Sequence, residues 1–227
     1  ILDILLLTNA HYPEINISKD QFLELKSNWL IKNYNLQLIE NYLIKNQIIN
    51  EHPKLTKLLV DDYLSKSEIK KACEFFYKIQ GSIQDDYLSK FNIYCLINNN
   101  KKEEAQLLLD LKKEAGFEEK FYENKINFLM GYSNQPDVEI SEKTILDFHL
   151  SHRTNPQFKF EPNDSTSNQI WKYLSTSNLL DSIKDVELTD INKVSSIEKA
   201  THEKHYEENE LFELYKRFQF NINQLLN

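Results

Sequence analysis

The sequence predicts an all-α fold: a right-handed α-solenoid of antiparallel helix hairpins, followed by a further helical part. Two observations predict it. Between residues 18 and 116, apolar and small residues return in the same order three times with a period of 33 residues, and such a period is typical of stacked supersecondary units. Glycine is scarce, at 3 of 227 residues, which argues against β-hairpins because their tight turns need positive φ.

The repeat divides each unit into two helices. Positions of the first helix and then of the second recur across the three units at the same 33-residue spacing. These matched positions are Phe22, Leu55 and Leu88; Leu25, Leu58 and Phe91; Leu30, Tyr63 and Leu96; Ile39, Ala72 and Ala105; and Tyr42, Phe75 and Leu108.

Helix start and stop signals accompany the period. Ser18 is placed to cap the first helix, which we expect to turn at residues 33–35. Pro53 stands where the first turn of the next helix tolerates a missing N–H. Gly81 and Gly116 follow the second helices of their units, as glycine commonly does past a helix C-terminus.

The N-terminal residues continue the pattern. Leu6 and Ala10 lie 33 residues before Ile39 and Leu43. We therefore interpret residues 1–10 as the second helix of a preceding repeat. Because a solenoid end needs a polar cap, this pattern predicts that the chain is a fragment of a longer protein.

The C-terminal half loses the period but remains helical. We expect a helix over 118–130, a second over 143–152 capped by Ser141, and others over 167–180, 188–200 and 205–226. Residues 153–168 contain two prolines around Phe158 and Phe160, which alternate as in an extended segment. We predict that both rings are partly buried, and we divide the chain into domains at 1–132 and 133–227.

The middle unit resembles a tetratricopeptide-type (TPR-like) repeat in divergent form. Tyr63 stands for the aromatic residue near the end of the first helix, Ala72 for the small residue that lets the second helix approach, and Phe76 for the aromatic residue one turn later. The resemblance covers roughly residues 18–116 and implies a concave groove that binds peptides or partner helices. The groove positions at period 33 that we expect to bind a partner are Asn28, Lys32, Asp61, Ser65, Tyr94 and Asn98.

Composition restricts the partners. A formal net charge of −8 disfavours nucleic acid, since phosphate binding needs clustered Lys and Arg. No apolar run approaches a membrane span, and no Gly-rich loop is present for ATP or NAD, so we expect no cofactor. We interpret Cys73 and Cys95 as buried free thiols. We expect a soluble chain, favour the cytoplasm over export, and note that a targeting segment was either removed or never present.

Catalytic motifs are not found. His202 and His205 are three residues apart, whereas the zinc-protease helix motif places its histidines four apart; His149 and His152 have the same spacing. We interpret all four as solvated polar residues and expect no metal site. The sequence thus predicts a non-catalytic scaffold or adaptor for a peptide, a protein or another part of its own chain. The alternative is an ancillary helical-superhelix region of a larger enzyme, such as a cell-wall lytic enzyme, whose catalytic domain lies outside this chain.

Overall fold

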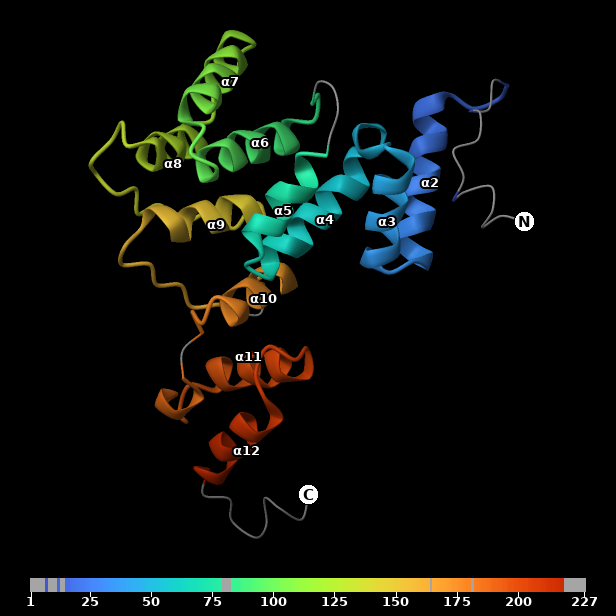
Figure 1. Cartoon of the computed structure of the whole chain (residues 1–227). Helices are drawn as coiled ribbons and strands as arrows, with labels where there is room; N and C mark the ends of the chain where they lie inside the picture. Colours follow the sequence, from blue (N-terminus) through green and yellow to red (C-terminus); the bar gives the residue numbers. More distant parts are fainter. Residues whose placement is uncertain are drawn as a thin grey trace.

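The computed structural model describes residues 7, 12, 15–78, 83–163, 165–180 and 182–218, with the backbone alone at residue 185. All regular secondary structure in these ranges is helical and no strand is present there, which confirms the all-α class. The helices, shown in Figure 1, are α2 Lys19–Asn33, α3 Leu36–Asn46, α4 Pro53–Ser65, α5 Ile69–Phe76, α6 Asp86–Asn98, α7 Lys102–Glu114, α8 Lys120–Met130, α9 Ile145–Thr154, α10 Asn168–Thr176, α11 Ile191–His202 and α12 Glu208–Lys216, with short 3-10 turns η1 Ile49–Glu51 and η2 Ile183–Asp185.

The N-terminal half consists of consecutive helix pairs. α2 packs on α3, α4 on α5, and α6 on α7. Neighbouring pairs meet where α3 contacts α4 and where α5 contacts α6. These pairs coincide with the three units that the 33-residue period predicts.

Several predicted helix signals act as expected. The Ser18 hydroxyl accepts from the backbone N–H of Gln21 at 3.2 Å and caps α2. The predicted turn at residues 33–35 separates α2 from α3, and there the Asn35 amide oxygen accepts from Leu38 N and caps α3, a cap that was not predicted. Pro53 is the first residue of α4, and Gly116, with φ of +92°, follows the end of α7.

One predicted helix cap differs from the cap in the structure, and some predicted helix ends cannot be compared. Ser141 does not cap the helix that follows it; α9 begins at Ile145 and is capped by the Thr144 hydroxyl, which accepts from Asp147 N. The predicted stop at Gly81 lies outside the described residues, as does all of the predicted 1–10 helix except Leu7 and the part of the last helix after residue 218. Leu7 is helical and packs against the α2–α4 core.

The two cysteines form a disulfide, so the prediction of free thiols is wrong. Cys73 of α5 and Cys95 of α6 are joined with their Cα atoms 5.5 Å apart. Both are buried in the main core. The bond connects the second helix pair to the third, two elements that are already in contact.

Among the residues that the structure describes, three hydrophobic cores follow one another along the chain. One lies among α2, α3 and α4. The largest is built from α4 through α10 and therefore contains residues from both sides of the boundary proposed after residue 132. The third is formed by η2, α11 and α12, which extend away from the other helices at the lower end of Figure 1.

The non-helical segment between α9 and α10 packs as predicted at its two aromatic residues. Phe158 and Phe160 are partly buried against the main core. Their rings meet Phe148 of α9 at centroid distances of 5.6 and 4.9 Å, both edge to face, a favoured geometry for aromatic pairs. Both rings therefore fasten this segment to α9.

A buried lysine holds the loop between α8 and α9. Lys125 of α8 is fully buried, and its ammonium donates to the backbone carbonyls of Asp137 and Glu139 at 2.8 and 2.6 Å. The Asp137 carboxylate lies 3.2 Å away. These acceptors compensate for the desolvation of the charge, and the loop is thereby fixed beside α9.

Candidate functional site

The six predicted binding residues divide into two groups. Asn28 and Lys32 of α2 and Asn98 of α6 are exposed. The other three, Asp61, Ser65 and Tyr94, are buried. The period therefore places equivalent positions on the same side of each first helix, but the chain itself covers half of them.

The covering elements are α9 and α10. Both pack on α4, and Figure 1 shows them along the underside of the N-terminal helix pairs. Thr176 of α10 donates from its hydroxyl to the Ser65 carbonyl at 2.9 Å, and the Lys172 ammonium lies 2.9 Å from the Asp62 carboxylate. α9 and α10 thus cover part of α4 and α6, where the repeat resemblance implies groove positions.

Tyr94 belongs to a buried chain of hydrogen bonds. His149 of α9 contacts the Tyr94 hydroxyl through Nε2 at 2.7 Å and the Tyr173 hydroxyl through Nδ1 at 2.9 Å. His152 Nδ1 also contacts Tyr173, at 2.7 Å. A neutral imidazole has one N–H donor and one acceptor nitrogen, so one tyrosine donates to His149 and the other accepts from it.

Burial keeps this chain uncharged. Desolvation, with smaller contributions from the Arg153 and His152 charges, lowers the pKa of His149 to about 3. Burial raises the pKa of Tyr94 to about 12, against the opposing effect of Arg153. At neutral pH the network is therefore a set of neutral hydrogen bonds that joins α6, α9 and α10.

Asp61 has a similar internal role. The Tyr87 hydroxyl of α6 donates to its carboxylate, and both side chains are buried. Burial raises the pKa of Asp61 to about 6, although the Tyr87 bond and the Lys57 charge oppose the shift. Asp61 therefore bonds to α6 rather than facing a partner.

A second buried histidine, His52, carries no motif that identifies it in the sequence. The Ser27 hydroxyl lies 2.9 Å from His52 Nδ1, and the Tyr42 hydroxyl lies 3.4 Å from His52 Nε2. A Ser–His contact can activate a serine nucleophile when a third group orients the histidine and substrate can reach the hydroxyl. Here Ser27 is 3% exposed, His52 is 1% exposed, and burial lowers the pKa of His52 to about 4. This contact joins α2 to α4.

The prediction that the paired histidines are solvated is wrong for His149, which is 3% exposed because α9 packs it against α6 and α10. His205 stacks on Trp171 with ring centroids 6.2 Å apart, and its Nε2 lies 2.6 Å from the Asn168 amide oxygen. His149 and His152 both contact Tyr173. The described part of the chain contains no group of three or more His, Cys, Asp or Glu residues that could hold a metal ion.

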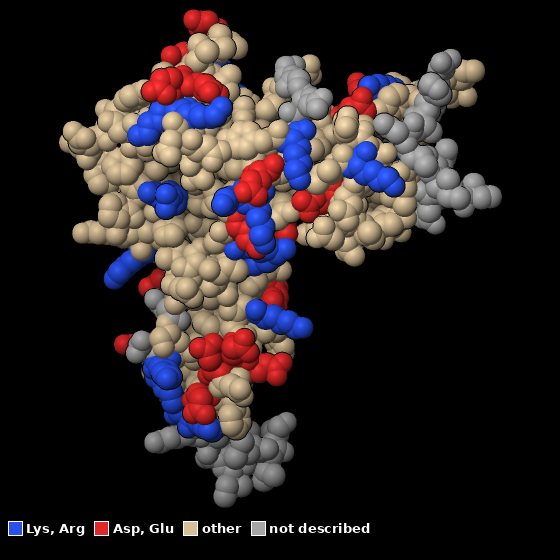
Figure 2. All heavy atoms as spheres, in the orientation of Figure 1, with Lys and Arg blue, Asp and Glu red and all other residues tan. Residues whose placement is uncertain are grey.

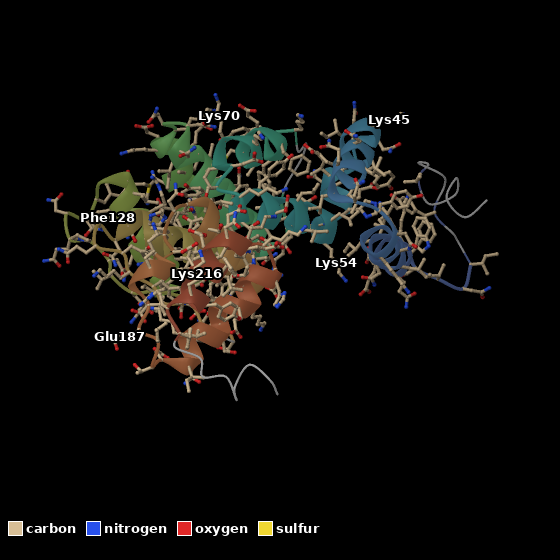
Figure 3. All side chains as sticks on the ribbon, turned by 90° about the horizontal axis from the view of Figure 1, so that it is seen from below. Lys45, Lys54, Lys70, Phe128, Glu187 and Lys216 are labelled. Atoms are coloured by element: carbon tan, nitrogen blue, oxygen red, sulfur yellow. A yellow bond between two sulfur atoms is a disulfide. The ribbon has the colours of Figure 1, made fainter. Side chains whose placement is uncertain are left out.

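The exposed binding candidates Asn28 and Lys32 lie on an open apolar face of α2. Leu25 is 52% exposed and Ile31 is 37% exposed, and at 3.6 residues per turn they share one side of the helix with Asn28 and Lys32. The Asn28 amide oxygen accepts from the ammonium of Lys54 on α4, a residue labelled in Figure 3. We call Leu25, Asn28, Ile31 and Lys32 the α2 face.

Two open hollows adjoin the α2 face. One has a volume of about 560 Å³ and is lined by Ile31, Tyr34, Asn35, Leu36, Gln37, Ile39 and Leu58. The other has a volume of about 570 Å³ and is lined by Asn16, Ile17, Gln21, Glu24, Leu25 and Asn28. The lining of the first hollow is predominantly apolar, whereas that of the second contains both apolar and polar groups. A ligand could therefore bury apolar groups at one end of the α2 face and form hydrogen bonds at the other.

Within the described residues, no helix has the length and apolar character to cross a membrane. No protein-family model matches the chain. No curated protein and no solved structure matches it either.

Proposed function

We propose that the chain is a non-catalytic, TPR-like helical adaptor that binds a peptide or protein partner through the α2 face. The observation that carries the proposal is the exposure of Leu25 and Ile31 beside two open hollows. Exposed apolar residues that adjoin one another on a surface commonly mark an interaction site. Asn28 and Lys32, on the same face, supply polar groups that can orient a ligand.

The buried polar groups support an adaptor over an enzyme. Tyr94, His149 and Tyr173 bond to one another, and Ser27 bonds to His52. Each of these side chains is buried. Their reactive atoms are used in holding helices together, which is a structural role.

A second candidate function is the ancillary superhelical region of a larger exported enzyme. The Cys73–Cys95 disulfide favours it, because structural disulfides persist in oxidising compartments and are rare in the cytosol. In this case the α2 face would contact another domain of the same protein. The sequence of the full-length parent distinguishes the two candidates: a catalytic domain supports this one.

A peptide-display selection tests the adaptor proposal. Peptides selected on the purified chain are titrated against the parent and against Ile31→Glu, which introduces a charge at the centre of the α2 face. We expect Ile31→Glu to weaken binding by about tenfold or more, as loss of a central apolar contact does in many interfaces. Val138→Glu is the matched control, since Val138 is equally apolar, 66% exposed and lies in the α8–α9 loop. Selected peptides that bind all three proteins equally would refute the assignment of the site to α2.

A further inference from the structure

α7 has two apolar sides, and only one of them is buried. Ala105 and Leu109 are fully buried against the main core. Leu107 and Leu111 are 61% and 51% exposed on the opposite side. An amphipathic helix that serves only the fold needs one apolar stripe, so the second stripe requires another explanation.

Acidic residues surround the exposed leucines. Glu103, Glu104, Asp110 and Glu114 are exposed, and at 3.6 residues per turn they fall with Leu107 and Leu111 within roughly 120° of arc. We call these six residues the α7 face. Figure 1 shows α7 projecting beyond α6 and α8, and Figure 2 shows acidic side chains gathered at that end of the molecule.

The lysines of α7 do not neutralise this face. Lys112 pairs with Asp86 at 2.7 Å and Lys113 with Glu123 at 2.7 Å, both off the α7 face. Of the four acids, Glu104 pairs with Lys101 at 3.0 Å. Within the described part of the chain, Glu103, Asp110 and Glu114 form no ion pair. The face therefore keeps most of its negative charge around an apolar centre.

We infer that the α7 face binds a basic amphipathic helix of a partner protein, a second surface distinct from the α2 face. Charge complementarity selects this occupant: Lys or Arg residues flanking an apolar stripe would pair with the acids while the stripe covers Leu107 and Leu111. A symmetric dimer through two α7 faces does not fit, because it would bring like charges together. An anionic lipid surface is disfavoured for the same reason.

The probe is a synthetic peptide of about 18 residues, roughly five helical turns, made of Leu and Lys with the leucines on one helical face. A peptide of the same composition in scrambled order measures attraction by charge alone. Binding to the parent chain is followed by fluorescence anisotropy at low salt and at about 0.3 M salt, where exposed charges are strongly screened. We expect saturable 1:1 binding of the amphipathic peptide and markedly weaker binding of the scrambled one.

Two double variants separate the contributions of the leucines and of the acidic residues to peptide binding. Leu107→Ser with Leu111→Ser should weaken binding by about tenfold or more, and Glu103→Gln with Glu114→Gln should weaken it and reduce its dependence on salt. Val138→Ser and the pair Glu187→Gln with Glu208→Gln are matched controls, because all three residues are exposed away from α7. Circular dichroism and thermal melting verify that each variant folds.

Equal binding of the scrambled peptide, or unchanged binding by the double leucine variant, would overturn the inference. Its failure is distinguishable from failure of the adaptor proposal. Peptides selected on the α2 face respond to Ile31→Glu and are indifferent to changes at Leu107 and Leu111, so either surface can be refuted while the other stands.

Discussion

At the scale of single residues, the main finding is that buried histidines connect helices through hydrogen bonds. His149 reaches Tyr94 on α6 and Tyr173 on α10, and His52 reaches Ser27 on α2. Sequence spacing does not reveal these contacts. His149 is distant in sequence from both of its partners, and only the packing of α9 against α6 and α10 brings them together.

The low pKa of His149 predicts an acid-sensitive contact. In the folded chain its pKa is about 3, below the ordinary value of 6.5, so between these values the unfolded chain binds a proton that the folded chain does not. Stability from His149 is therefore present above pH 6.5 and is lost as the pH falls. The free energy of unfolding of the parent relative to His149→Gln should decrease by roughly 1 to 3 kcal/mol between pH 7 and about 4.5. Urea titrations at several pH values measure the difference, and a difference independent of pH would contradict the prediction.

At the scale of helices and loops, much of the structure could be predicted from the sequence. The 33-residue period locates three helix pairs, the cap at Ser18 marks the start of α2, and Pro53 marks the first turn of α4. These signals are local or strictly periodic. The disulfide was missed because its pairing depends on the contact between α5 and α6, and because apolar surroundings also suit a free thiol.

The sequence also could not predict that α9 and α10 cover some of the expected groove positions. The same periodic positions are exposed at Asn28 and buried at Tyr94, since α9 and α10 pack near the second and not the first. The 33-residue period predicts which side of its helix a residue occupies. It does not predict whether the non-periodic helices α9 and α10 will pack against that side.

The repeat register makes a prediction about helix packing. Ala72 of α5 is fully buried in the main core, so Ala72→Leu should overpack it and reduce the free energy of unfolding by about 1 to 3 kcal/mol. Lys71→Leu is the matched control, because Lys71 is the exposed neighbour on the same helix, and it should be nearly neutral. Thermal and urea unfolding of both variants provide the measurement, and equal losses would refute the register.

The segment between α9 and α10 makes a second prediction at this scale. Replacing Phe158 and Phe160 by Ser removes two rings that pack edge to face on Phe148. The loss of buried aromatic surface should lower the free energy of unfolding by roughly 2 to 5 kcal/mol. Limited proteolysis should then cut faster between Arg153 and Asn168. If the double variant melts and digests like the parent, the rings do not fasten the segment.

At the scale of the whole molecule, the covalent link between the second and third helix pairs has a measurable effect. The Cys73–Cys95 bond closes a loop with a sequence separation of 22 residues, for which the chain-entropy model gives about 3 kcal/mol of stabilisation. Reduction of the disulfide should therefore lower the urea concentration at which half of the protein is unfolded. The variant Cys73→Ala with Cys95→Ala should not respond to the reductant. A parent whose unfolding is the same with and without reductant would contradict the prediction.

At this scale the structure is a series of helix pairs in which the C-terminal helices α9 and α10 cover part of α4 and α6. α9 and α10 bond to α4 and α6 through Thr176, Lys172 and His149. The central claim of the proposed function is that a ligand binds on the α2 face, while α9 and α10 stay packed on α4 and α6.

Hydrogen–deuterium exchange with a peptide selected on the chain tests this claim most directly. Bound peptide should slow amide exchange in α2 and α3, over residues 19–46, and leave exchange in α4, α6, α9 and α10 unchanged. Ile31→Glu should abolish the protection, whereas Val138→Glu should preserve it. Protection of α4 and α6 together with faster exchange in α9 and α10 would mean that the ligand displaces α9 and α10 from α4 and α6, which would contradict the account.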